Sequence, residues 1–174
     1  MTRVTWREER TILIELPDRN FTVGQMLFEP YVQFFNYFWG DADEARSARV
    51  EALPQLFCVA VVREFLKARC EALSSTHAPV AQVPTRWIHP LMRAGVGFRG
   101  GDLIEFDPRA GRSGSEEPLI QDLNAAEHRE IIDAHELTNL RGGDEFVSRL
   151  TLCRAHGRNV DPFKAQVFGF EYGS

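Results

Sequence analysis

No motif in this sequence marks a serine or cysteine as a catalytic nucleophile. A serine or cysteine nucleophile needs a base beside it, and the G-x-S-x-G turn that presents serine in many hydrolases does not occur. Ser113 and Ser115 lie in a polar, glycine-containing segment that is typical of a flexible loop. The cysteines are odd in number, far apart and set in apolar or helical patterns, which favours buried free thiols: Cys58, Cys70 and Cys153.

Metal and phosphate motifs are equally sparse. Zinc sites need paired ligands at short spacing, and here no C-x-x-C occurs and the five histidines are scattered. His128 and His135 could share a helix face beside Asp133, although a hydrogen-bonded or exposed histidine is the more common case. The glycines of residues 95–101 lack the following helix and the Lys-Ser/Thr pair of a phosphate-binding loop. The sequence therefore predicts no enzymatic activity, no cofactor and no metal.

Acidic residues are concentrated in one part of the chain. Residues 102–145 contain 12 acidic and 4 basic side chains, a balance of −8, whereas the whole chain carries −5. This sign argues against a general nucleic-acid binder, which needs positive charge to contact phosphates. A solvated face is the simplest explanation, and a surface that attracts a basic partner is the other. Such a partner would contact the carboxylates around a predicted late hairpin: Glu105, Asp107, Glu116, Glu117 and Asp122.

The elements that must position these side chains begin with three strands predicted in residues 9–38. Ile12, Ile14 and Leu16 recur at period two, and a turn of Pro, Asp and Asn follows them. Gly24 lies within the second strand, where glycine indicates a bulge or a close backbone approach. The third strand, residues 31–38, has five aromatic side chains and should nucleate a core.

The remaining pattern completes an α+β protein, and its length of 174 residues predicts a single domain, 1–174. We expect a curved antiparallel sheet or partly open barrel of five to seven strands with C-terminal helices. It comprises a β-rich core over about residues 9–62, a hairpin over about 102–120 and a helical region over about 124–157. In the first half of the chain the pattern also predicts a helix over 44–53, a strand over 56–62, a helix or continued strand over 63–73 and a loop over 74–84. In the second half it predicts a strand over 86–89 closed by Pro90, helices over 127–132 and from Asp144 to Gly157, and a final strand over 167–172.

No apolar run approaches the roughly 20 residues that span a bilayer, and the first residues lack the apolar core of a signal peptide. The expected location is the cytoplasm, with no membrane association.

The order of these motifs resembles a known family. The segment ILIELPDRNFTVGQMLFEPYVQFFN resembles the opening hairpin and aromatic strand of the immunity protein 26 family of bacterial polymorphic-toxin systems. LPQLFCVAVV is similar to its next strand, RWIHP stands in the place of its aromatic run before a proline, and FVSRL is similar to its C-terminal helix. The chain departs from the family at Asn20 and lacks the tryptophans expected near residues 70–74 and 137–140.

The resemblance implies a small bacterial cytoplasmic protein that neutralises a cognate toxin by stoichiometric occlusion, with no catalytic residues. A basic nuclease is the kind of toxin that the acidic segment would fit. The alternative function is a small-molecule or single-stranded nucleic-acid binding module that uses the aromatic strand 31–38 as a platform. No Lys or Arg occurs in that strand, which argues against nucleic acid as a partner.

Overall fold

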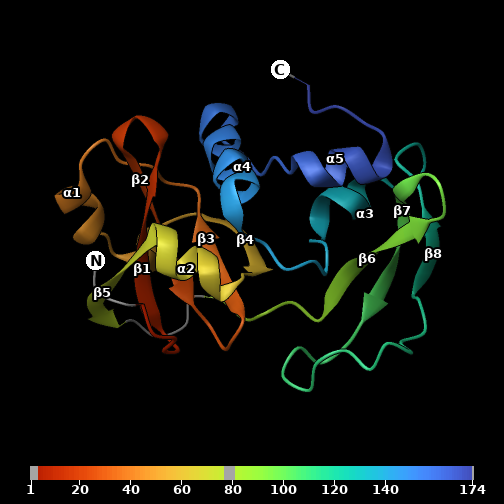
Figure 1. The fold of residues 1–174 in the computed structure, drawn as a ribbon, viewed down its shortest axis with the longest axis horizontal. Helices are drawn as coiled ribbons and strands as arrows, with labels where there is room; N and C mark the ends of the chain where they lie inside the picture. Colours follow the sequence, from red (N-terminus) through yellow and green to blue (C-terminus); the bar gives the residue numbers. More distant parts are fainter. Residues whose placement is uncertain (1–3, 77–80, 174) are drawn as a thin grey trace. The chain divides into compact units, whose positions relative to one another are not determined.

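The computed structural model describes residues 4–76 and 81–173, and the backbone of these residues divides into two compact units (Figure 1). Unit 1 comprises Met1–Val83 and Leu140–Val160, and unit 2 comprises Pro84–Asn139 and Asp161–Ser174. The chain therefore leaves unit 1, builds most of unit 2, returns to unit 1 for one long helix and ends in unit 2. The single domain that the length predicts stays a prediction.

Unit 1 is a five-stranded antiparallel sheet with helices on both faces. Its strands lie in the order β4-β3-β2-β1-β5, so β4 and β5 form the two edges. Its elements are β1 (Arg10–Leu16), η1 (Pro17–Arg19), β2 (Asn20–Met26), β3 (Tyr31–Phe35), α1 (Ala42–Arg46), η2 (Val50–Ala52), β4 (Gln55–Ala60), α2 (Arg63–Arg69), β5 (Cys70–Thr76) and α4 (Gly143–His156).

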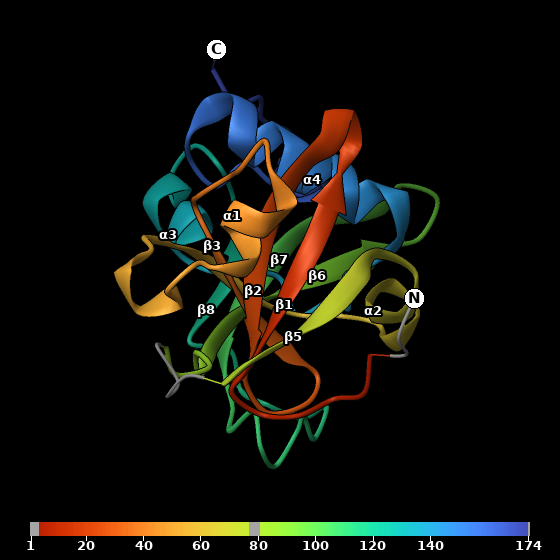
Figure 2. The ribbon, with the colours of Figure 1, turned by 90° about the vertical axis from the view of Figure 1, so that its left-hand side faces the viewer.

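Period-two alternation divides the apolar side chains of unit 1 between the two faces of its sheet. On one face, Leu13, Val23 and Phe35 pack against Ala45 of α1. Figure 2 shows α1 in front of the strands on this side. On the other face, Phe34 lies within 5.3 Å of the Phe57 ring and 5.2 Å of the Phe146 ring of α4, measured between centroids. The three predicted N-terminal strands are thus confirmed, although the third ends at Phe35 and not at residue 38, and α4 covers the aromatic face.

Gly24 is in a regular ladder, opposite Ile12 on one side and Phe34 on the other, so it marks a close approach and not a bulge. A Cβ atom added to it would lie 2.8 Å from the Val32 Cγ1 atom and 3.3 Å from the carbonyl oxygen of Gln33. We predict that Gly24→Ala lowers the free energy of unfolding by about 1–3 kcal/mol, because the added methyl overpacks the sheet. Urea unfolding would measure this, and a variant as stable as the wild type would contradict it.

Unit 2 is a three-stranded antiparallel sheet with two short helices. The strands lie in the order β6-β7-β8 and pack against α5, which brings Val167 into a core with Ile88 and Leu103 (Figure 1). Its elements are β6 (Arg86–Arg93), β7 (Gly97–Glu105), β8 (Ile120–Leu123), α3 (Arg129–Ala134) and α5 (Pro162–Phe168). The pairing of Leu103 with Ile120 confirms the predicted late hairpin.

Two sequence predictions fail in unit 2. Pro90 does not close the first strand, because β6 runs on to Arg93 with Pro90 paired to Gly101. An edge strand tolerates proline, and the register shifts directly after it. The predicted final strand over 167–172 is also wrong: the chain forms helix α5, which Asp161 caps by accepting hydrogen bonds from the amides of the first turn.

In unit 1 the segment 44–53, predicted as one helix, contains parts of two short helices, α1 and η2. Asp41 accepts hydrogen bonds from the amides of Asp43 and Glu44, so α1 begins at Ala42 and ends at Arg46, and η2 follows separately. For the segment 63–73 the helix prediction is correct as far as Arg69, where α2 ends, and the alternative of a continued strand is wrong, since β5 is a new strand that begins at Cys70. The loop prediction for 74–84 is wrong as far as Thr76, and its residues 77–80 lie outside the described part.

Other predictions agree with the structure. The fold is α+β and its sheets are antiparallel and open, not closed into a barrel. Helix α4 ends at Gly157 in the left-handed conformation, with φ of 63°. The predicted helix over 127–132 is found at Arg129–Ala134, slightly later in the chain. All three cysteines are buried and free.

Candidate functional site

The predicted acidic surface lies in unit 2, and this unit carries the whole formal charge of the protein. Counted over the residue ranges of the two units, unit 1 has 13 acidic and 13 basic residues, whereas unit 2 has 12 acidic and 7 basic residues, or −5. The excess is therefore a property of one structural unit and not only of a sequence window. A potential of this kind attracts a cationic partner over a range set by screening.

Two of the five predicted carboxylates lie at the end of β7. Glu105 is the last residue of the strand and accepts hydrogen bonds from Thr85 and from Arg86, whose Nε atom is 3.2 Å away. Asp107 follows in the loop, is exposed, and accepts a hydrogen bond from the Arg109 amide at 2.9 Å. Glu105 is thus partly neutralised, whereas the side chain of Asp107 contacts only a backbone donor within the described chain.

The next two carboxylates lie in the loop between β7 and β8. Glu116 folds back and accepts hydrogen bonds from the amides of Ser113 and Gly114, at 2.6 and 3.3 Å, while Arg112 lies 3.8 Å away. Hydrogen bonds from backbone amides, its own first and then those of the loop, lower the pKa of Glu116 below its usual range. Its role is to hold the loop, and the exposed Glu117 beside it is the carboxylate offered to solvent.

Asp122 is separated from the others. It lies in β8 with φ of 50°, its amide donates to Asp102 at 2.8 Å, and its carboxylate pairs with Arg93 at 2.9 Å. Asp102 is three residues from Glu105 along β7, which corresponds to about 10 Å at the usual rise of a strand. The structure therefore spreads the predicted cluster along one hairpin, with Asp107 and Glu117 as its most available charges.

One histidine, His89, lies beside these carboxylates, and the sequence alone did not assign it to the acidic surface. His89 of β6 lies opposite Asp102, and its Nδ1 atom is 3.3 Å from the guanidinium of Arg112. Partial burial, followed by the positive charge of Arg112, lowers the pKa of His89 below its ordinary 6.5, and the acids Asp102 and Glu116 oppose this.

We therefore predict that His89 titrates below pH 6.5 in the folded protein. Because its pKa is higher in the unfolded chain, its contribution to stability is present above the unfolded value and is lost as the pH falls through the folded value. An NMR titration of the imidazole measures the folded pKa. In Arg112→Gln this pKa should rise toward the ordinary value, and an unchanged pKa would contradict the assigned role of Arg112.

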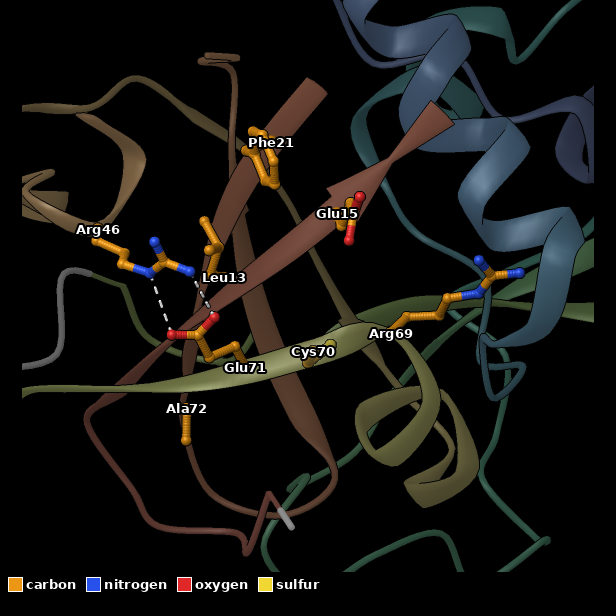
Figure 3. Close-up of a pocket in the computed structure, with 8 residues that line it drawn as sticks. All are labelled: Leu13, Glu15, Phe21, Arg46, Arg69, Cys70, Glu71 and Ala72. Carbon is orange, nitrogen blue, oxygen red and sulfur yellow. Dashed lines mark hydrogen bonds and ion pairs between the residues drawn. The ribbon is translucent and has the colours of Figure 1, made fainter. Parts of the chain in front are cut away.

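A pocket of about 380 Å³ lies in unit 1 over the edge formed by β5 (Figure 3). Its walls combine charged and apolar side chains from β1, β2, β5, α1 and the end of α2: Leu13, Glu15, Phe21, Arg46, Arg69, Cys70, Glu71 and Ala72. Figure 3 shows Arg46 facing Glu71, with Glu15 standing apart from both.

The Arg46 guanidinium donates two hydrogen bonds to Glu71, of 3.1 Å from Nε and 2.9 Å from Nη2, and a third to Asp43, of 2.7 Å from Nη1. These contacts raise the pKa of Arg46 and lower that of Glu71. Burial raises the pKa of the Cys70 thiol, so this cysteine is not a ready nucleophile. The pocket can hold a polar or cationic group, but it presents no activated nucleophile.

No sequence signal pointed to this pocket, because Arg46 and Glu71 are 25 residues apart and in different elements. Within residues 4–76 and 81–173, no group of three or more His, Cys, Asp and Glu side chains could hold a metal ion. His128 instead accepts a hydrogen bond from the Asn124 amide, and the His135 ring lies 2.9 Å from the Ile131 carbonyl oxygen. No helix of the described chain is long and apolar enough to cross a bilayer.

Comparison with known proteins gives a family without a described activity. No curated protein and no solved structure matches the chain. One family model matches residues 1–171, nearly the whole sequence. The chain therefore belongs to the family described as a domain of unknown function, DUF8309.

Proposed function

We propose that this protein is an immunity protein that binds a cognate bacterial toxin in the cytoplasm and neutralises it by stoichiometric occlusion. The observation that carries the proposal is the charge of unit 2, −5, together with the exposed carboxylates of Asp107 and Glu117. A toxin that acts on nucleic acid has a basic cleft, and an acidic protein surface can occupy such a cleft in place of the polyanion.

The resemblance to the immunity protein 26 family supports the same proposal independently of charge. Most of the segments that carry it form β1, β2, β3, β4 and α4, which build much of unit 1, and RWIHP lies in β6 of unit 2. Under this proposal unit 1 supplies the stable frame and unit 2 supplies the acidic surface. The protein has no turnover of its own, and its effect saturates at one copy per toxin.

The experiment is co-expression with the product of the adjacent gene, which this proposal expects to be the toxin. We expect growth rescue, a complex with one copy of each protein by light scattering, and toxin activity that falls linearly to zero at equimolar inhibitor. Continued toxicity without complex formation, or suppression at far less than one equivalent, would reject occlusion. The second outcome would indicate an enzyme that modifies the toxin.

The second candidate function is a binding module for small molecules or single-stranded nucleic acid, and few aromatic side chains near residues 31–38 are accessible for it. The residues of β3 are all buried, so Tyr31, Phe34 and Phe35 have no exposed ring face for a base to stack on. Beyond β3, the Tyr37 side chain is 48% exposed, and its ring lies 4.6 Å from that of the partly buried Trp39, measured between centroids. Titration of tryptophan fluorescence with oligothymidylate tests this candidate, and a flat titration rejects it for single strands.

A further inference from the structure

The outer edge of β5 in unit 1 has no strand beside it. β5 pairs with β1 on one side, and no backbone hydrogen bond joins its other side to any segment of the described chain. The opposite edge of the sheet differs at the C-terminal end of β4. There the Arg141 amide donates a hydrogen bond to the Ala60 carbonyl oxygen, with a distance of 2.7 Å. Within the described residues, β5 therefore offers an open edge that a further strand could extend.

The register shows which backbone groups point outward from β5. The Cys70 amide donates to the Leu66 carbonyl at the end of α2, so it is not available to pair with Ile14 of β1. Pairs in an antiparallel ladder alternate between those that exchange hydrogen bonds and those whose backbone groups point away. Leu13 and Glu71 are then the bonded pair, and the N–H and C=O of Ala72 face outward.

Side chains that usually block a free edge are missing at this point of β5, where the register against β1 is regular from Cys70 to Ala72 and shifts only beyond Ala72. Proteins block such edges with lysine, proline or an outward-pointing charge, and β5 contains neither lysine nor proline. Its one charged residue, Glu71, is turned back over the sheet by Arg46 and does not stand in the way of a new strand (Figure 3).

The pocket described above lies along this same edge, since consecutive residues of β5 line it: Cys70, Glu71 and Ala72. Around it Glu15 and Glu71, together with Asp43 and Asp144 that pair with its two arginines, give four acids against the two bases Arg46 and Arg69, a balance of −2. Both arginines are engaged with carboxylates, whereas Glu15 is exposed and has no ion pair among the described contacts. A cationic side chain is the group that this arrangement favours.

We propose that the β5 edge binds an extended segment of a partner protein by strand addition, with a lysine or arginine of that segment placed in the pocket beside Glu15. Main-chain hydrogen bonds at Ala72 give the affinity and the pocket gives the selectivity. The interaction goes beyond the proposed function, because it belongs to unit 1 and does not require the partner to be a toxin.

The test uses three blocked synthetic peptides of alternating threonine and valine. One has arginine at its centre, the second has glutamate there, and the third has the central arginine with proline on each side. Amide chemical shifts of the protein are followed by NMR during titration. We expect the arginine peptide to shift the amides of residues 71–74 and to slow hydrogen exchange at Ala72, the glutamate peptide to bind about 3–5-fold more weakly, and the proline peptide not to bind.

Glu15→Gln is the variant that separates the two parts of the proposal, because it leaves the backbone of β5 unchanged. We expect it to bind the arginine and glutamate peptides equally, still through the same amides. Absence of shifts at millimolar peptide, shifts elsewhere, or equal binding of the proline peptide would overturn the proposal. If the amide chemical shifts of residues 71–74 changed with protein concentration in the absence of peptide, the edge would instead bind a second copy of the chain. No toxin is needed, so this result is independent of the co-expression experiment.

Discussion

Replacement of Phe34 by alanine is expected to lower the free energy of unfolding by about 3–5 kcal/mol. Phe34 is fully buried, and its ring lies against both Phe57 of the neighbouring strand and Phe146 of α4. The cavity left by the phenyl group would open at the contact between the sheet and α4, where neither the strand nor the 14-residue helix can easily move inward. Urea unfolding followed by circular dichroism measures the loss.

The matched control is Tyr37→Ala, which removes a ring of similar size from the same stretch of chain. Tyr37 is 48% exposed and contacts Trp39, so the expected loss is about 1.5 kcal/mol or less. A Phe34→Ala protein that melts within about a degree or two of the wild type, or no lower than the Tyr37 control, would show that the sheet core is elsewhere.

The N-terminal sheet was predictable because its signal is local. Ile12, Ile14 and Leu16 alternate with side chains of the other face, and the turn after them contains Pro17 and Asp18. Each strand is thus specified by its own residues and its connection, and the pairing of β1 with β2 follows. β3 is wholly buried because both faces of the sheet are covered there: Phe35 packs with Ala45 of α1 on one face, and Phe34 lies against Phe146 of α4 on the other.

The apolar alternation near the end of the sequence predicted a strand, but the capping signals before it determine a helix, α5. Val167, Phe168 and Phe170 suggest a strand, but Asp161 caps the preceding turn and Pro162 is at its first position, where proline costs a helix nothing. Gly169 then ends the helix in the left-handed conformation, with φ of 66°. The alternating residues are the end of a helix and the chain beyond it.

The candidate sites depend on tertiary pairing, which a single sequence does not encode in any short window. Nothing near Glu71 indicates that Arg46 will bind it, and nothing in residues 70–76 indicates that β5 will be an edge. Composition did identify the acidic region, because charge excess needs no contacts to be visible. It could not indicate that Glu116 binds its own loop or that Asp122 pairs with Arg93.

Neutralising the available acids of unit 2 is expected to slow association with a basic toxin by about tenfold at low salt. The variant replaces four carboxylates of the candidate surface and keeps Glu116, because that side chain holds its loop. It carries Glu105→Gln, Asp107→Asn, Glu117→Gln and Asp122→Asn, so that the formal charge of unit 2 changes from −5 to −1.

The reason for expecting a rate effect is that exposed pairs contribute only about 0–1 kcal/mol each to the final complex, whereas their summed field steers the encounter. Dissociation should change less than association. The difference from the wild type should shrink as ionic strength rises, because the screening length falls from about 10 Å at 0.1 M salt to about 3 Å at 1 M.

A matched control separates the position of the charge from its total. Four exposed acids of unit 1 are replaced in the same way, which gives the same net charge for the whole protein: Asp18→Asn, Glu44→Gln, Glu64→Gln and Glu145→Gln. Stopped-flow association with the toxin that the co-expression experiment identifies is measured for both variants at low and high salt, after circular dichroism confirms that both fold. If unit 2 is the docking surface, the control retains most of the wild-type association rate and salt dependence. Equal slowing of both variants would make the effect one of total charge, and no slowing of either would leave the acids of unit 2 as a solvated face.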